Sequence, residues 1–321
     1  MKNLLLNLKF VLLVSILSFG LFGCNLQNEV KSNDELLIAK INQHFKTDEY
    51  LTSHNLVNPY NEEVKDIRVF HKYIFKELQN KRQVNGYTKP SKKTAYASIF
   101  QFVNDDKGNL GINDAEDAAF VKEKLEVFNQ NQNKQFDGNK FDAINNKMNT
   151  YSNDEAGVNA MLEDALKENA INETQSTILK STLLEISKAK TLKEAIAINT
   201  TVEFEVLNSK IKDSDKTLIL YINSIFANHF ANQPAGISLN QGENPLYKKA
   251  AVVVAIVVQT IIYAAIGAAV GFAIGTIVCC GNNPGSGACN SGCLRSYVIE
   301  GAIVGGIAGA WNGIEGIYMW E

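Results

Sequence analysis

A run of 31 residues without a formal charge, Ala250–Cys280, constrains the fold of this chain more than any other feature. As one helix it would be about 46 Å long at ~1.5 Å per residue, which is enough to cross the hydrocarbon core of a bilayer. A helix that is apolar on all sides is stable only in a membrane or in the core of a protein. Lys248 and Lys249 stand directly before the run.

Glycines recur at every fourth residue in this run and again in the apolar segment that follows it. They are Gly267, Gly271 and Gly275 in the first segment, and Gly301, Gly305, Gly309 and Gly313 in the second. Residues four apart share one face of a helix, so each segment carries a stripe without side chains. Because glycine costs about 1 kcal/mol relative to alanine inside a helix, this accumulation in register indicates a role in packing. We predict that all seven are helix-packing positions, since small residues at this spacing let two helices approach closely.

The first 24 residues have the layout of an export signal. Met1–Lys9 carries two lysines and no acid, and Phe10–Leu21 is almost wholly apolar, a pattern typical of a secretory signal peptide. The segment that ends in Leu21, Phe22, Gly23 and Cys24 resembles the lipobox of bacterial lipoproteins, although Phe22 stands where a small residue is usual.

This resemblance implies cleavage before Cys24 and attachment of lipid to Cys24, including an acyl chain such as palmitate. Two or more acyl chains anchor a protein stably. Asn25 follows the cysteine, and the usual sorting rule then implies the outer membrane or the cell surface. The alternative is an ordinary secretory leader in which Cys24 carries no lipid.

The loop between the two glycine-bearing segments contains the other cysteines of the chain: Cys279, Cys280, Cys289 and Cys293. An even number of cysteines in an exported protein favours disulfides. Because adjacent cysteines bridge each other badly, two connectivities remain open. One pairs 279 with 289 and 280 with 293, and the other pairs 279 with 293 and 280 with 289. A four-cysteine zinc site is the rival interpretation, although the paired C-x-x-C spacing is lacking.

These features predict a helical hairpin in which Ala250–Val278 and Leu294–Trp320 pack against each other. In the second segment, Glu300 and Glu315 enclose only 14 residues, or about 21 Å of helix, which is too short for a hydrocarbon core of ~30 Å. Two environments therefore remain open. The hairpin either contacts a lipid bilayer and self-associates through its glycine faces, or it is a buried core wrapped by the helices that precede it.

The region before the hairpin is predicted to be all-α, an irregular bundle of about seven to nine helices. Three segments fit the capping box, in which a polar N-cap residue and a glutamate three positions later satisfy free backbone N–H groups. They are Ser32–Glu35, Ser152–Glu155 and Thr191–Glu194. Apolar residues follow at helical spacing, as in Val64, Ile67, Phe70, Ile74 and Leu78.

Composition divides the chain into parts. The segment from 232 to 249 contains two prolines and two glycines and reads as a linker. The predicted organisation is a signal peptide (1–23), a lipidated flexible tether (24–35), a helical body (36–231), the linker (232–249) and a glycine-zipper hairpin with its cysteine-rich turn (250–321).

Motifs for catalysis or metal binding are not found in the sequence. The four histidines, His44, His54, His71 and His229, form no H-E-x-x-H pair, and we expect each to be hydrogen-bonded in the fold or exposed to solvent. Segments 104–109 and 133–142 are rich in Asn and Asp but do not match the EF-hand loop, so we predict turns. We expect no enzyme activity, no catalytic residue, no metal and no cofactor.

The charge balance excludes one large class of partners. The chain has 31 basic and 34 acidic side chains, and two of the lysines belong to the leader. No basic stripe exists, so we expect no nucleic-acid partner. The sequence does not indicate a particular protein partner.

Three functions fit these observations. The first is a lipid-anchored envelope protein whose hairpin inserts into a membrane or self-associates there; in arrangement the chain resembles glycine-zipper envelope lipoproteins. The second is the precursor of a membrane-active antibacterial peptide, released near Lys248-Lys249 from a helical carrier or immunity domain, because the tail resembles small Gly- and Cys-rich antibacterial peptides. The third is a soluble binding lipoprotein in which the hairpin is the core.

Overall fold

The computed structural model describes residues 32–84, 109–152, 154–189, 191–230, 245–281 and 290–318. These ranges contain ten helices and no strand, which confirms the all-α class. The helices are α2 (Asn33–Thr47), α3 (Asn61–Val84), α4 (Ala115–Asn131), α5 (Gly138–Met148), α6 (Glu155–Lys167), α7 (Glu173–Lys188), α8 (Leu192–Asn208), α9 (Asp213–Phe230), α10 (Pro245–Cys280) and α11 (Ser291–Tyr318).

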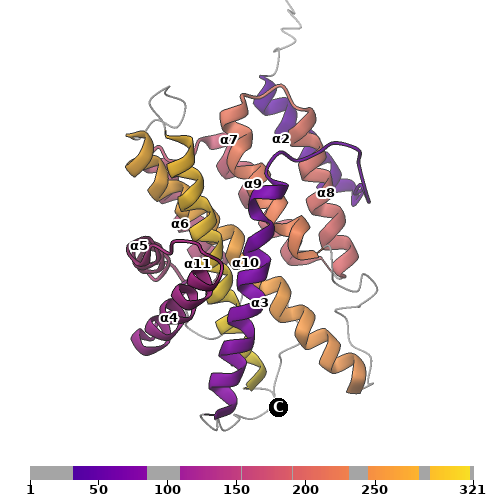
Figure 1. The fold of residues 1–321 in the computed structure, drawn as a ribbon. Coiled ribbons are helices and arrows are strands. Elements are labelled where there is room, and N and C mark those ends of the chain that lie inside the picture. The colour runs from indigo at the N-terminus through magenta and orange to yellow at the C-terminus, as the bar shows by residue number, and fades with distance from the viewer. Residues whose placement is uncertain are drawn as a thin grey trace, which may run out of the picture.

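The two C-terminal helices, α10 and α11, form an antiparallel hairpin that runs through the middle of the molecule (Figure 1). Helices α3 and α9 pack against one side of the hairpin, and α5 packs against both of its helices. Helices α2, α7 and α8 form a second layer, which reaches the hairpin through α9 and, from α7, through α6. Helix α4 lies outside and contacts α3 and α5. The first part of α10 runs away from the other helices, toward the lower right of Figure 1.

Hairpin and body share one hydrophobic core. The side chains from Ile262 to Val270 are almost completely buried, and they belong to the same cluster as body residues such as Ile74, Leu125 and Ile225. Body helices such as α3 are amphipathic and turn their apolar face inward. The change in composition near residue 250 therefore marks the change from amphipathic helices to helices that are mostly apolar. It does not separate two hydrophobic cores.

Two of the three predicted capping positions are confirmed. Ser32 forms a full capping box with Glu35: its hydroxyl accepts from the Glu35 N–H at 3.2 Å, and its own N–H donates to the Glu35 carboxylate at 2.8 Å. Thr191 caps α8 by accepting from the Glu194 N–H at 3.1 Å. Helix α2 therefore begins inside the segment predicted as a flexible tether.

The prediction that Ser152 is an N-cap residue is wrong. Asp154 is the N-cap of α6, because its carboxylate accepts from the Gly157 N–H at 2.8 Å. The Ser152 hydroxyl instead donates to that carboxylate at 2.6 Å. A capping box that the sequence reading missed opens α7, where Asn172 and Gln175 bond to each other's backbone.

The hairpin helices are longer at three of their four ends than predicted. Helix α10 begins at Pro245, inside the predicted linker, and α11 begins at Ser291. Proline fits the first turn of a helix because its missing N–H has no partner there. Lys248 and Lys249, the candidate cleavage site, therefore lie within helix α10. Residues 1–31 and 231–244, which include Cys24 and most of the linker, lie outside the described residues.

Candidate functional site: the hairpin and its contacts with the body

The glycine stripes of α10 and α11 face each other inside the hairpin. A Cβ atom added to Gly267 would lie 2.0 Å from the carbonyl oxygen of Gly301, and one added to Gly301 would lie 2.0 Å from that of Gly267. A Cβ on Gly305 would lie 2.0 Å from the Tyr263 carbonyl oxygen. Cβ atoms do not approach backbone this closely in folded proteins, so the two helices can touch only because these side chains are absent.

The same close approach continues toward the turn. A Cβ on Gly271 would lie 2.0 Å from the Tyr297 carbonyl oxygen, and one on Gly275 would lie 2.8 Å from the Tyr297 Cβ. Five of the seven predicted packing glycines thus pack helix on helix within one chain. Gly309 is buried further along α11, and Gly313 lies in the last part of α11, where only the backbone is described.

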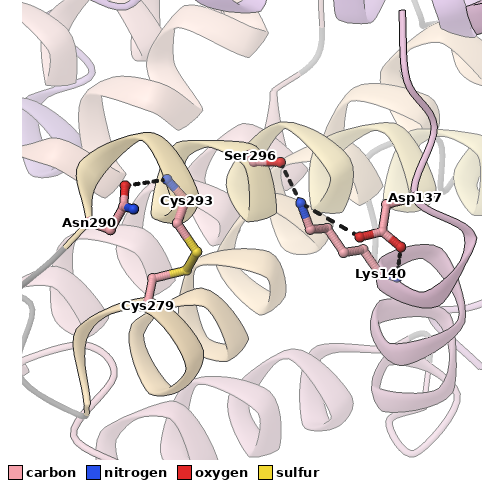
Figure 2. Close-up of a disulfide and its surroundings, with 6 residues drawn as sticks. All are labelled: Asp137, Lys140, Cys279, Asn290, Cys293 and Ser296. Carbon is pink, nitrogen blue, oxygen red and sulfur yellow. Dashed lines mark hydrogen bonds and ion pairs between the residues drawn. A yellow bond between two sulfur atoms is a disulfide. The ribbon is translucent and has the colours of Figure 1, made fainter.

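A disulfide closes the turn of the hairpin (Figure 2). Cys279 and Cys293 are bonded, with their Cα atoms 5.8 Å apart. This bond belongs to the second predicted connectivity, so the first, which paired 279 with 289, is wrong. Cys280 is also disulfide-bonded, and Cys289 lies outside the described residues. Asn290 caps α11, since its side-chain oxygen accepts from the Cys293 N–H at 3.0 Å.

Polar contacts hold α11 to the body at three points. At the first, the Lys140 ammonium of α5 donates to the Ser296 hydroxyl at 2.7 Å and lies 5.0 Å from the centre of the Tyr297 ring. Figure 2 shows Lys140 reaching across from α5, where Asp137 lies 3.9 Å from the same ammonium. Asp137 also caps α5, so this lysine is held at the start of its helix.

The second contact is an ion pair near the start of α11. The Arg295 Nε lies 3.0 Å from a carboxylate oxygen of Glu63 on α3. The Tyr221 hydroxyl of α9 donates to the same Glu63 oxygen, and burial raises the Tyr221 pKa. Glu63 therefore joins α3, α9 and α11 at one place.

The third contact is a pair of buried histidines. Nδ1 of His71 on α3 lies 2.8 Å from Nε2 of His229 on α9. Nε2 of His71 lies 3.1 Å from the Ala302 carbonyl oxygen and 3.2 Å from that of Ile303, both on α11. His229 Nδ1 lies 2.8 Å from the Ile225 carbonyl oxygen. Their side chains are buried, with residue exposures of 5% and 4%.

Gly306 makes room for this pair. A Cβ at this position would lie 2.1 Å from Cε1 of His71. Sequence reasoning missed both Gly306 and the histidine pair, because His71 and His229 are 158 residues apart and lie on different helices. The only signal available was that Gly306 stands beside the regular glycine stripe. The expectation that each of these histidines is hydrogen-bonded is confirmed.

Glu300 is a partly buried acidic residue of α11 that faces α5. One of its carboxyl oxygens is buried without a hydrogen-bond partner. Burial raises the pKa of Glu300 to about 7, and the nearby Lys140 opposes this shift only in part. In the folded state described here, Glu300 is therefore largely neutral below pH 7.

The remaining two histidines contact glutamates of α8. His54 Nε2 lies 3.0 Å from Glu203, whose other oxygen accepts from the Asn58 amide at 2.6 Å, while His54 Nδ1 accepts from the Leu56 N–H at 3.1 Å. Both ring nitrogens are thus occupied, so His54 has no nitrogen free to act as a general base. His44 likewise contacts the Glu49 carbonyl oxygen and Glu205.

In the described part of the chain, no group of three or more His, Cys, Asp or Glu side chains is arranged so that it could hold a metal ion. Of the predicted turn 133–142, Asn133 has a left-handed φ of 51°, and α5 begins at residue 138. Most of the turn predicted at 104–109 lies outside the described residues.

One stretch, Ile262–Cys280, is long and apolar enough to cross a membrane, judged by length and composition over the described residues; 78% of it is buried inside the protein. No protein-family model, curated protein or solved structure matches the chain.

Proposed function

We propose that this chain is a lipid-anchored envelope protein that stores an apolar hairpin inside a helical body and inserts that hairpin into a membrane. The observation that carries the proposal is the kind of contact that covers each hairpin face. The inner faces of α10 and α11 are glycine stripes in mutual contact, and the buried apolar side chains of Ile262–Ala273 and Val298–Ala308 join the core that the body helices form.

Such a hairpin can change its surroundings without changing its own structure. Its backbone hydrogen bonds are satisfied inside the two helices, as a membrane requires. Close packing of small residues works in lipid as it does in protein, because it depends on van der Waals contact. Side chains such as Ile266 and Val270 lose little when lipid tails replace apolar protein.

The polar contacts of α11 then set the cost of release. Helix α10 carries no charged side chain after Lys249, whereas α11 is tied to the body through Arg295, Ser296 and the carbonyl groups that face His71. The glycine faces contact each other within one chain, so self-association through those faces would require the hairpin to open.

The two tryptophans of the chain provide a test that needs no label. Both Trp311 and Trp320 belong to the hairpin segment. The mature lipidated protein is reconstituted into vesicles that contain phosphatidylcholine brominated along its acyl chains. Because bromine quenches tryptophan only at short range, insertion quenches the emission, whereas a hairpin that stays in the body above the membrane surface keeps it.

A matched pair of variants tests the packing mechanism. Gly271→Leu removes the contact with the Tyr297 backbone, whereas Gly292→Leu adds a side chain where the nearest atom, in Asn290, is 3.5 Å away. We expect Gly292→Leu to be quenched like the unmodified protein and Gly271→Leu to lose quenching and vesicle leakage. Unquenched emission from folded, unmodified protein from pH 4.5 to pH 7.5 would contradict membrane insertion.

The second candidate is a soluble binding lipoprotein in which the hairpin is a permanent core. The 78% burial of Ile262–Cys280 favours it, since core helices of soluble proteins pass the same length and composition test. It predicts full tryptophan emission and intact vesicles under every condition in which the protein stays folded. Nothing in the described geometry favours the antibacterial-peptide precursor, because proteases cut extended segments and Lys248-Lys249 lies in a helix.

A further inference from the structure

The histidine pair has more hydrogen-bond positions than protons when both rings are neutral. A carbonyl oxygen only accepts, so His71 Nε2 needs a proton to bond to α11, and His229 Nδ1 needs one to bond to Ile225. Each neutral imidazole has a single N–H. With both protons used in this way, two lone pairs face each other across the 2.8 Å between the rings.

The pair also has no room for a full set of four protons. If both rings were cationic, an N–H on His71 would point at an N–H on His229 across the same 2.8 Å. Two positive charges would then be buried together between α3, α9 and α11, which is costly in an apolar interior. One additional proton would bond the two rings to each other, but it would bury a positive charge in the same apolar interior, which burial disfavours. The packed state therefore disfavours proton uptake, whereas two histidines separated in water take up one proton each near pH 6.5.

We propose that His71 and His229 form a proton-operated latch that holds α11 against the body at neutral pH and releases it in acid. This rests on the proposed function in one respect, since the released element is the hairpin that would insert. At the latch, His71 of α3 contacts the α11 backbone, and His229 of α9 contacts His71. Separation of the rings exposes both to water and lets both become charged.

The direction of the pH effect follows from proton linkage. Burial lowers the pKa of His71 to about 3, helped by the neighbouring His229. Burial also lowers the pKa of His229 to about 4, helped by the positive charge of Arg68 on α3. Between about pH 6.5 and pH 4 the released state thus binds two more protons than the latched state, and the opening constant rises by up to ~100-fold per pH unit of acidification.

Other charged groups on the helices that meet at the latch change how steeply the opening constant depends on pH. On α11, Arg295 is paired with Glu63, and Glu300 faces Lys140 and Asp137 of α5. Because burial raises the pKa of Glu300 to about 7, Glu300 loses a proton on release into water between about pH 7 and pH 4.5. This proton loss lowers the opening constant by up to ~10-fold per pH unit of acidification. Together with the two histidine protons, it leaves an opening constant that rises by about 10-fold per pH unit of acidification.

Hydrogen exchange of the α11 amides measures the opening constant in the full-length protein. Rates for residues 298–308, corrected for intrinsic exchange at each pH, are compared with those of α2, which packs mainly against α7 and α8. In the unmodified protein, we expect opening of α11 to rise by about 10-fold for each unit between pH 6.5 and pH 4.5. Replacement of a buried polar pair by apolar residues of similar volume is often tolerated, so His71→Leu/His229→Leu serves as the variant.

Three variants make the test specific. His71→Leu/His229→Leu leaves only the Glu300 term, so its slope should reverse and opening should fall about 10-fold per unit of acidification. Glu300→Gln should steepen the slope to about 100-fold. His44→Gln, which removes a histidine bound to Glu205 instead of the hairpin, should keep the unmodified slope. A double variant with the unmodified slope would overturn the proposal.

A direct measurement does not depend on the variants folding. Titration of ¹⁵N-histidine signals in the unmodified protein should show that His71 and His229 take up protons only when the α11 amides exchange. Uptake of two protons with α11 still protected would overturn the latch. Tryptophan quenching at pH 5 separates the two proposals. If the slopes hold but quenching does not occur, membrane insertion fails and the latch stands. If the double variant and the unmodified protein are quenched equally at every pH, the latch fails and insertion stands.

Discussion

At the scale of single residues, the glycines of this chain differ by what faces them. Gly267, Gly301 and Gly305 face backbone across the hairpin, Gly306 faces an imidazole, and Gly292 faces only the Asn290 side chain, which is 3.5 Å from the Cβ position. Gly281 is different again, because it ends α10 with a left-handed φ of 58° and nothing within 4 Å of a Cβ atom there. The regular spacing in the sequence identifies the first group but cannot distinguish the cause at each position.

Alanine substitutions measure this difference. Alanine gains about 1 kcal/mol of helix propensity over glycine, which favours both Gly267→Ala and Gly292→Ala. At Gly267, however, the new methyl group lies 2.0 Å from backbone, which cannot move aside as a side chain can. Because overpacking costs about 1–3 kcal/mol and more where rigid backbone must shift, we expect Gly267→Ala to lower the free energy of unfolding. Gly292→Ala should leave it unchanged or raise it, and equal effects in urea titrations would contradict the packing role.

Glu300 provides a second prediction at this scale. Because its pKa is raised to about 7 in the folded state, the stability it contributes is present below its ordinary pKa of about 4.3 and is lost as the pH rises through 7. Glu300→Gln removes the buried charge, so we expect it to raise the free energy of unfolding at pH 8.5 by about 1–3 kcal/mol and to change it little at pH 5. Glu62→Gln is the control, since Glu62 is exposed on α3. The same gain at both pH values would show that charge is not the cause.

At the scale of elements, the sequence predicts the type of structure better than its boundaries. Helical spacing and capping residues predict all-α structure, and the described part of the body has eight helices within the expected range. Ser152 and Asp154 both suit an N-cap, and spacing alone favours Ser152. The structure selects Asp154 because Ser152 is used in a bridge with Asn109, a partner 43 residues away.

In the candidate site, too, some features could be predicted from the sequence and others could not. The glycine stripes and the bonded cysteines could be predicted because their pattern is local. The contacts between His71 and His229 and between Glu63 and Arg295 join segments more than 150 residues apart. No local pattern encodes such pairs, and they depend on which helices the shared core brings together.

Capping substitutions test the boundaries. Loss of an N-cap side chain costs about 1 kcal/mol of stability. We therefore expect Asp154→Ala and Asn172→Ala each to lower the free energy of unfolding by about 1 kcal/mol, because each side chain accepts a hydrogen bond from its own helix. Ser152→Ala should cost less, since it removes only a hydrogen bond to the cap. If thermal unfolding showed a larger loss of stability for Ser152→Ala than for Asp154→Ala, Ser152 would be the N-cap of α6, as its spacing from Glu155 predicts.

At the scale of the whole molecule, the central fact is that one core joins two unlike sets of helices. The hairpin is apolar around most of its surface, whereas the body helices are apolar on one face. The hairpin and the body helices therefore each bury apolar surface of the other that would otherwise be exposed to water. Without the hairpin, α3 and α9 would expose the residues that now contact it, and we expect a chain that ends before residue 245 to bind hydrophobic dyes or aggregate.

A shared core also predicts that hairpin and body unfold together in water. Far-ultraviolet ellipticity reports on all helices, while tryptophan emission reports on the hairpin alone, since Trp311 and Trp320 are the two tryptophans of the chain. The two signals should give the same midpoint in urea at pH 7.5. Leu37→Ala in α2 sharpens the test, because Leu37 is buried and α2 packs mainly against the body helices α7 and α8. The substitution should cost about 2–5 kcal/mol and lower both midpoints equally. If the tryptophan midpoint stayed in place while the ellipticity midpoint fell, the hairpin would be stable independently of the body. Contacts with the body would then not hold the hairpin in place, which would contradict the proposed release mechanism.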